Sequence, residues 1–308
     1  MVAGYIITTD TKDPMPSNAP NHVDAAHRDE VARGERFAFG KNWTHFLAHL
    51  SPERIDSAVT SLRSMLDVQT LEGRTFLDIG SGSGLFSLAA HQLGATVVSF
   101  DYDADSVACT NELRRRYAST STRWTVSQGS VLDDVFMRGL GVFDVVYSWG
   151  VLHHTGAMWK AIDNATPRVK PGGTLFIALY NDQGVWSHRW RRIKRTYCSG
   201  TAGRWLVSTA FISFWGARNL VADLVWFRNP VSRYTEYAAH RGMSIVRDWH
   251  DWLGGYPFEF AKPEDIILPL SKRGFRLTNL VTAGGSVGCV EYVFSQDRTQ
   301  AVEAEPTG

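Results

Sequence analysis

The sequence predicts an α/β protein built on a doubly wound, mostly parallel sheet, and three observations support this fold class. Short β-rich runs alternate with helical stretches between residues 75 and 180. A glycine-rich loop, Gly80-Ser81-Gly82-Ser83-Gly84, joins the first β-rich run to a helical stretch. An acidic residue, Asp101, ends the next β-rich run. The alternation of β-rich and helical runs is typical of parallel strands with helices on both faces of the sheet.

The expected elements follow in chain order. Helices are expected over 25–33 and 42–66, the second broken at Ser51-Pro52, where serine is a natural N-cap and proline suits a first helical turn. The core is expected to alternate strands and helices over 75–79, 85–93, 96–100, 104–117, 124–126, 143–147, 157–169 and 174–180. The expected regions are a tail and N-terminal helical cap (1–70), the core (71–180), a helical insertion (181–260), a final helix and strands (261–295) and a tail (296–308).

Composition and charge limit the function classes. The 308 residues are 44% hydrophobic and 20% charged, which is typical of a globular protein. The formal net charge of +1 lacks the basic excess of a whole-surface nucleic-acid binder, so no nucleic-acid partner is predicted. Three cysteines without CxxC spacing argue against a zinc knuckle or a disulfide framework. The N-terminus has no apolar secretory core, so a cytoplasmic location is predicted.

Two carboxylates flank the predicted nucleotide-binding loop. Asp78 precedes Gly80 by two residues, and an anion there suits an ammonium group and repels a pyrophosphate. Asp101 lies where a carboxylate can accept hydrogen bonds from both ribose hydroxyls of a nucleoside. The alternative is that Asp101 caps the following helix, for which Asp103 is also placed. Tyr102 is positioned either to pack on the adenine or to lie in an exposed turn.

Five motifs occur in one order: FLDIGSGSG, VVSFDYD, VSQGSVLD, FDVVYSWGVLHHT and VKPGGTLFIALYN. Together they resemble the motifs of class I S-adenosylmethionine-dependent methyltransferases, in the small-molecule branch. The resemblance implies a seven-stranded Rossmann-like sheet ending in a β-hairpin, here 276–280 and 290–294. It also implies S-adenosyl-L-methionine as cofactor, with Asp78, Gly80, Ser81, Gly82 and Gly84 around the methionine part, Asp101 and Tyr102 at the nucleoside, Gly129, Ser130 and Val131 at the adenine and Trp149 beside the sulfonium.

One position departs from the family pattern. The family often has an acidic residue where this chain has Ser130, accepting from the adenine amino group. A hydroxyl accepts more weakly, and Gln128 or a backbone carbonyl is the alternative partner.

The run 147–155 is expected beside the sulfonium, and it lacks the Asn/Asp-Pro-Pro-aromatic motif of enzymes that methylate nucleic-acid amines. Paired histidines without a nearby acid or cysteine do not complete a metal site, so no metal is predicted. His154 and His250 are the candidate general bases, with packing or surface histidines as the alternative. Candidate substrate contacts are His153, Tyr180, Trp186, Tyr256 and Glu259.

The insertion concentrates aromatic and basic residues. Residues 181–252 hold seven of the eleven tryptophans, and 186–204 hold six Lys/Arg residues and no acid. The stretch 205–227 is long enough to span a bilayer, but Arg218 and Asp223 argue against it. An amphipathic helix or helix pair packed over the active site as a lid is predicted, with peripheral membrane contact through 186–229 as the alternative.

The predicted function is methyl transfer from S-adenosylmethionine to a small, hydrophobic or aromatic metabolite. The alternative acceptor is a lipid or polyprenyl-linked molecule at a membrane surface. Alternatives of another class are an NAD-dependent dehydrogenase and a cofactor-binding module without catalysis. The dehydrogenase is disfavoured because the third glycine of G-x-G-x-x-G falls on Leu85 and because Asp78 would repel a pyrophosphate. Oligomeric state is not predicted.

Overall fold

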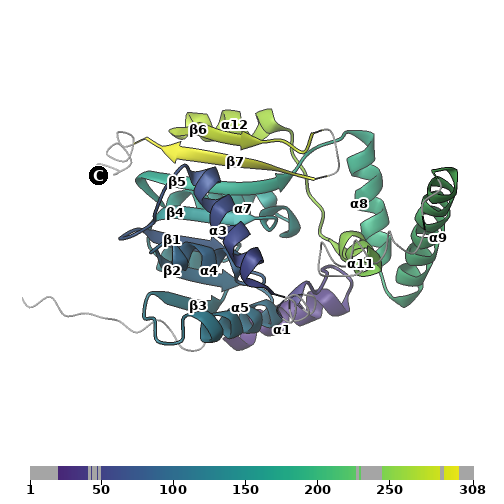
Figure 1. The fold of residues 1–308 in the computed structure, drawn as a ribbon, viewed down its shortest axis with the longest axis horizontal. Helices are drawn as coiled ribbons and strands as arrows, with labels where there is room; N and C mark the ends of the chain where they lie inside the picture. The colour runs from purple at the N-terminus through teal and green to yellow at the C-terminus, as the bar shows by residue number, and fades with distance from the viewer. Residues whose placement is uncertain are drawn as a thin grey trace, which may run out of the picture.

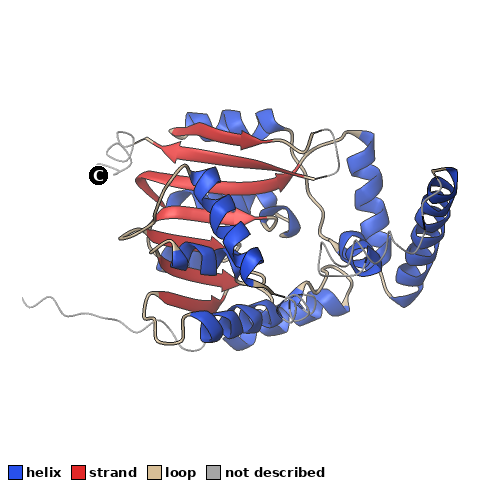
Figure 2. Ribbon diagram, viewed as in Figure 1, coloured by secondary structure: helices blue, strands red, loops and turns tan. Residues whose placement is uncertain are grey.

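The computed structural model describes residues 20–40, 43, 47, 50–226, 229, 245–284 and 288–297. Its centre is one seven-stranded sheet of order β3-β2-β1-β4-β5-β7-β6 (Figures 1 and 2). The strands are β1 (Thr75–Ile79), β2 (Thr96–Asp101), β3 (Trp124–Gln128), β4 (Phe143–Trp149), β5 (Val169–Tyr180), β6 (Phe275–Val281) and β7 (Cys289–Gln296). The first five are parallel, and β7 runs antiparallel between β5 and β6. The predicted fold class, including the terminal hairpin, is confirmed.

Helices cover both faces of the sheet, as a doubly wound fold requires. They are α1 (Pro20–Ala32), α3 (Pro52–Leu66), α4 (Leu85–Gln92), α5 (Ala104–Tyr117), α6 (Asp134–Gly139), α7 (Met158–Ala165) and α12 (Pro263–Lys272), with short 3₁₀ turns η1 (Leu152–His154) and η2 (Thr166–Arg168). One apolar cluster joins α7 and α12 to the sheet, and a second joins α3, α4 and α5 to it. The sequence did not predict α6; Asp133 caps it by accepting from the amides of Val135 and Phe136.

The strand order reverses between β1 and β4. From β1 the chain winds outward through β2 and β3, and it then returns to add β4 on the other side. In open α/β sheets a crevice forms outside the carboxyl ends of the strands at such a switch point. The loops after β1, β2, β3 and β4 therefore meet at one edge, where the sequence placed the candidate site.

The insertion forms α8 (Val185–Cys198), α9 (Thr201–Val225) and α11 (Ile245–Gly254). Helix α9 packs on α8 and α11 and stands at the outer side of the molecule, away from the strand ends (Figure 1). Helices α8 and α11 lie between α9 and the core (Figure 1), and the role of the insertion as a lid stays a prediction. Within the described ranges, no helix is both long and apolar enough to cross a membrane.

Candidate active site

A cavity of about 650 Å³ lies at the carboxyl ends of the strands. Its walls come from the β1–α4 loop, the starts of the loops after β2 and β3, the β4–η1 segment, the N-terminal cap and one residue of α11, Trp252. The predicted site residues that line it are Asp78, Gly80, Ser81, Gly82, Asp101, Tyr102, Gly129, Ser130, Val131, Trp149, His153, His154 and Tyr180. Gly84 lies just behind, as the N-cap residue of α4.

The loop after β1 turns sharply because its glycines adopt positive φ. Gly80 has φ of +77°, and a Cβ there would lie 2.4 Å from the Val151 side chain. Any larger residue would therefore push apart the loops that follow β1 and β4. Gly82, with φ of +54°, donates its amide to Asp101 Oδ2 at 2.9 Å, which ties this loop to the end of β2. The loop thus leaves backbone, and not side chain, facing the cavity.

A directed hydrogen-bond chain ends on Asp78. Trp124 Nε1 donates to Ser99 Oγ at 2.9 Å, Ser99 and Ser87 hydroxyls are 2.7 Å apart, and Ser87 Oγ donates to Asp78 Oδ2 at 2.5 Å. Because an indole only donates, the protons of this chain all point toward the carboxylate. Burial raises the pKa of Asp78 to about 7, opposed by the Ser87 hydrogen bond and reinforced by Asp101. Within the described part of the chain, no cationic side chain forms an ion pair with it.

Asp101 organises the end of β2. Its Oδ1 accepts from the Asp103 amide and its Oδ2 from the Gly82 amide, both at 2.9 Å. Burial raises the pKa of Asp101 to about 6, opposed by these backbone hydrogen bonds. Asp103, not Asp101, caps α5 by accepting from the Asp105 amide. Asp101 thus keeps spare lone pairs at the cavity for the ribose hydroxyls of a nucleoside.

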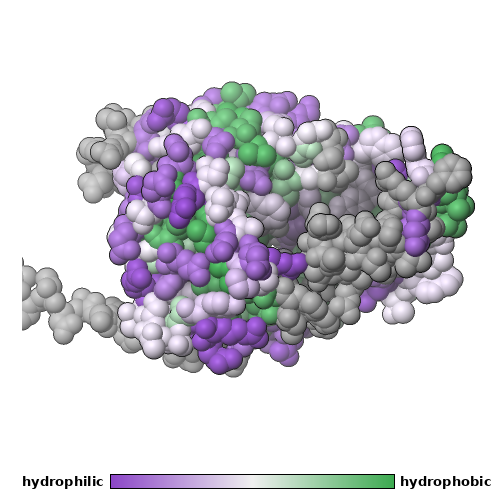
Figure 3. All heavy atoms as spheres, in the orientation of Figure 1, coloured by the Kyte–Doolittle hydropathy of each residue, from purple (hydrophilic) through white to green (hydrophobic). Residues whose placement is uncertain are grey.

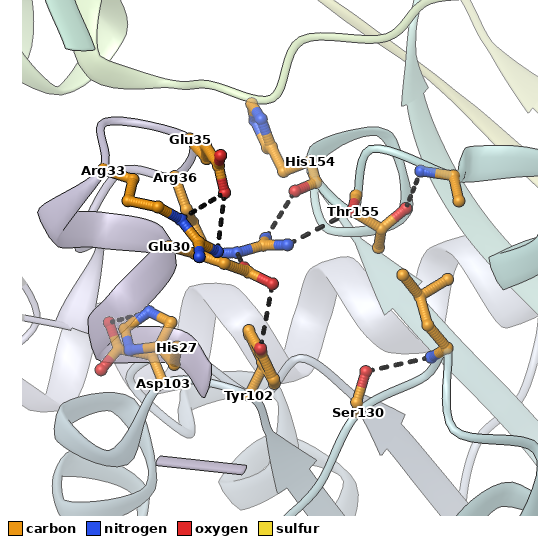
Figure 4. Close-up of polar contacts among 12 residues, drawn as sticks. His27, Glu30, Arg33, Glu35, Arg36, Tyr102, Asp103, Ser130, His154 and Thr155 are labelled. Carbon is orange, nitrogen blue, oxygen red and sulfur yellow. Dashed lines mark hydrogen bonds and ion pairs between the residues drawn. The ribbon is translucent and has the colours of Figure 1, made fainter. Parts of the chain in front are cut away.

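The predicted adenine end is formed by the loop after β3. Ser130 Oγ accepts from the Leu132 amide at 3.1 Å, so one lone pair and the hydroxyl proton remain for a ligand (Figure 4). Gln128, the alternative partner, donates its side-chain amide to the Tyr102 carbonyl and is not part of the cavity wall. Ser130 and the backbone around it are therefore the groups placed to meet an adenine.

The N-terminal cap closes one side of the cavity through Arg36, which the sequence analysis did not single out. Its guanidinium donates to Glu30 and to the carbonyls of His154 and Thr155, and it lies 5.0 Å over the Tyr102 ring (Figure 4). The Tyr102 hydroxyl in turn donates to Glu30. One side chain thus fastens the cap to the loops after β2 and β4. The aromatic run RFAFGKNW at 36–43 was the signal available in the sequence.

The two adjacent histidines have opposite tautomers. His154 Nδ1 lies 2.6 Å from the Pro257 carbonyl, which only accepts, so Nδ1 carries the proton and Nε2 keeps a lone pair. His153 Nδ1 accepts from the Tyr180 amide at 3.3 Å, so its proton is on Nε2. Burial lowers both pKa values, that of His154 to about 3, so both rings are neutral at pH 7. One ring offers an acceptor and the other a donor.

Two polar atoms at the cavity are left without a partner in the described structure. They are His153 Nε2 and the Tyr147 hydroxyl, both fully buried. Leaving a buried polar group unpaired costs about 1–3 kcal/mol. Both residues belong to the cavity wall, but these two atoms are themselves enclosed by protein.

Four predicted contacts lie elsewhere. His250 is hydrogen-bonded to Tyr197 between α11 and α8, and Trp186 is 59% exposed on α8. Glu259 accepts from the Met158 amide at the start of α7, and the Tyr256 carbonyl accepts from the Phe37 amide. The cavity wall contains none of these side chains. These four residues were predicted because they lie near aromatic and turn residues in the sequence. The direction in which a side chain points depends on tertiary packing, which the sequence does not show.

Candidate metal ligands do not gather in the described structure. Over its described ranges, no group of three His, Cys, Asp or Glu side chains is arranged to hold a metal ion. The histidine pair instead makes the backbone hydrogen bonds given above.

This sheet order, with a glycine loop after β1 and an acidic residue ending β2, is the arrangement expected of a class I S-adenosylmethionine-dependent methyltransferase domain. Residues 77–175 match the family model described as "Methyltransferase domain", and this part of the chain is such a domain. The match covers β1 through the middle of β5 and therefore includes the cofactor loop and both histidines.

Curated relatives match the same region. The ubiquinone biosynthesis O-methyltransferase of Brucella ovis is 32% identical over 111 residues, covering 36% of this chain and 43% of the relative. That of Paramagnetospirillum magneticum is 32% identical over 146 residues, covering 47% and 51%. The chain thus spans about half the length of these relatives.

Solved structures of similar arrangement include magnesium protoporphyrin IX methyltransferase from Synechocystis with bound S-adenosylhomocysteine, at 13% identity, TM-score 0.46, and coverage of 90% and 97%. N-methyltransferase NodS from Bradyrhizobium japonicum has 13% identity, TM-score 0.46, and coverage of 89% and 98%.

Proposed function

We propose that this chain transfers the methyl group of S-adenosylmethionine to a small hydrophobic or aromatic acceptor. The observation that carries the proposal is the pair of carboxylates at the glycine loop, buried Asp78 and half-buried Asp101. Asp78 has no cationic partner in the described structure, and an ammonium or sulfonium group supplies one. Asp101 presents lone pairs to ribose hydroxyls. When bound, S-adenosylmethionine supplies an electrophilic methyl group, so the protein must chiefly orient the acceptor in line with it.

The walls around the histidines fit an apolar acceptor with one polar atom. Phe37, Phe39, Tyr180 and Trp252 contribute aromatic surface to the cavity. The lone pair of His154 Nε2 can accept a hydrogen bond from an O–H or N–H group of the acceptor. A phenol or an amine on an aromatic ring supplies such a donor. These walls are also compatible with a lipid-linked acceptor, the alternative given above. Binding of S-adenosylhomocysteine rather than NADH distinguishes a methyltransferase with either acceptor from a dehydrogenase.

Cofactor binding should be linked to a proton. Since the pKa of Asp78 is about 7 and that of Asp101 about 6 in the free protein, both are partly protonated below pH 7. The ammonium group of the ligand favours the ionised form of Asp78, so the protein should release protons when S-adenosylhomocysteine binds. The affinity for S-adenosylhomocysteine should therefore rise as pH increases from 5 to 8, by about tenfold per pH unit at the acid end. Calorimetry in buffers of different ionisation enthalpy measures both effects.

Asp78→Asn is the companion variant and should flatten this pH dependence. NADH is the control ligand. Binding of NADH without S-adenosylhomocysteine would disprove the proposal, and a pH-independent affinity would remove the role given to Asp78.

The histidine assignment predicts a selective loss of turnover. His154→Asn keeps a side-chain N–H for the Pro257 carbonyl but removes the Nε2 lone pair. The rate of methyl transfer to an acceptor found in a metabolite panel should fall about 10²-fold at saturating cofactor. S-adenosylhomocysteine affinity should stay within a few fold. His250→Asn is the matched control, since His250 lies away from the cavity, and equal losses in the two variants would refute the assignment.

A further inference from the structure

Helix α9 exposes large apolar side chains although its inner face is already packed. Val207 and Phe211 pack against the apolar cluster shared with α8 and α11, and the buried residues of the helix are Asn219 and Asp223. Other large apolar side chains are exposed: Trp205 is 70% exposed, Phe214 65% and Trp226 72%. Such exposure of contiguous apolar surface is uncommon in monomeric soluble proteins and marks a contact surface.

The outward residues recur every three or four positions, so they form one stripe along the helix. They are Leu206, Ala210, Phe214, Ala217, Leu220, Val221, Leu224 and Val225, all exposed. Figure 3 shows hydrophobic atoms at the outer edge of the molecule, where α9 stands. A helix of 25 residues is about 37 Å long, so the stripe is an extended surface and not a pocket for a small ligand.

The helices α8 and α9 also form a basic segment. Residues 184–226 contain seven Lys/Arg residues and one acid, Asp223, which is buried. The whole chain has a net charge of only +1, so the remainder is slightly acidic. Exposed arginines of the pair are Arg189, Arg191, Arg192, Arg195, Arg204 and Arg218. In the described structure, none of them forms an ion pair with a carboxylate.

We propose that the α8–α9 pair docks on an anionic lipid bilayer, with the outward stripe of α9 lying in the interface and the arginines attracted to acidic headgroups. An apolar helical face combined with arginines and tryptophans is the composition of helices that lie in the membrane interface. Arginine and lysine stems can reach headgroups while their methylene groups stay on apolar surface. The docking uses none of the cavity residues, so it is independent of the proposed methyl transfer.

A second copy of the chain fits this surface less well. A symmetric dimer through α9 would bring the same arginines of both copies together. The pair exposes no carboxylate to neutralise them, because Asp223 is buried. An anionic lipid surface has the complementary charge and an apolar layer beneath it.

The test is co-sedimentation of the full-length protein with vesicles. Binding should be at least tenfold tighter to vesicles containing phosphatidylglycerol than to vesicles of phosphatidylcholine alone, and it should weaken as salt is raised. Arg192→Gln combined with Arg195→Gln should lower the affinity about fivefold per arginine.

The apolar stripe is tested by Val221→Glu combined with Val225→Glu, which should abolish vesicle binding. Val135→Glu combined with Val142→Glu is the matched control, since these valines are also exposed but lie outside α8 and α9. Circular dichroism melts check folding. If the Val221/Val225 variant is unfolded, the proposal is tested by the Arg192/Arg195 variant and by the comparison of phosphatidylglycerol with phosphatidylcholine vesicles.

Three results would overturn the proposal. One is wild-type protein that does not sediment with phosphatidylglycerol vesicles, and another is equal binding by the two valine pairs when both are folded. The third is a wild-type protein that is dimeric in sedimentation velocity and does not bind vesicles, while the Val221/Val225 variant is monomeric.

Discussion

Asp101→Ala should lower the affinity for S-adenosylhomocysteine by 10² to 10⁴-fold. The substitution removes two hydrogen bonds from a charged group to the ribose, each worth about 1.5–3 kcal/mol. It also leaves the amides of Gly82 and Asp103 without their acceptor, so the glycine loop loses its tie to β2. Isothermal titration at pH 8, where the carboxylate is ionised, gives the clearest comparison. Asp101→Asn retains one carbonyl oxygen and should lose less.

Asp133→Ala is the matched control for this effect. Asp133 also accepts two backbone amides, those of Val135 and Phe136, but it caps α6 and is absent from the cavity wall. Its loss should cost about 1 kcal/mol of stability and leave cofactor affinity unchanged. Equal affinity losses in both variants would indicate a general effect of removing a cap, and not a role of Asp101 at the ribose.

The fold and the cofactor side of the site were predictable because their signals are local. The glycine loop, Asp78 and Asp101 occur where the chain passes from strand to loop, and parallel strands bring those points to one edge. The histidine tautomers were not predictable, because they depend on the Pro257 carbonyl and the Tyr180 amide.

Other parts of the site depend on tertiary packing. Arg36 reaches residues more than a hundred positions away, and no sequence period reports such a contact. Glu259 was chosen for its charge near turn residues, yet it serves a helix start. The aromatic content of the insertion is visible in the sequence, but it does not show whether tryptophans turn inward or outward. In the structure Trp252 reaches the cavity, while Trp205 faces solvent.

Lys194 is the least expected residue of the insertion, because it belongs to the basic run 186–204, whose other charged side chains are exposed. It is fully buried, donates to the Trp252 carbonyl, and lies 4.5 Å and 5.0 Å from the ring centres of Trp252 and Phe258. No carboxylate pairs with it in the described part of the chain. Burial lowers the pKa of Lys194 to about 7, opposed by Cys198. A carbonyl and two ring faces only partly replace the lost hydration of an ammonium ion.

Lys194→Met should therefore stabilise the protein at neutral pH and change how its stability depends on pH. An unfolded lysine titrates near 10.5, so between pH 7 and 10.5 the unfolded wild type binds more protons than the folded one, and its stability should rise with pH. The penalty at pH 7 is on the order of 4 kcal/mol and disappears above pH 10.5. Methionine keeps the apolar volume without the charge, so urea unfolding should show a gain of about 2–4 kcal/mol at pH 7 that shrinks as pH rises. Lys160→Met, at a half-exposed lysine of α7, should show no such trend. A Lys194→Met variant that is destabilised equally at pH 7 and pH 10 would mean that the ammonium group is satisfied where it lies.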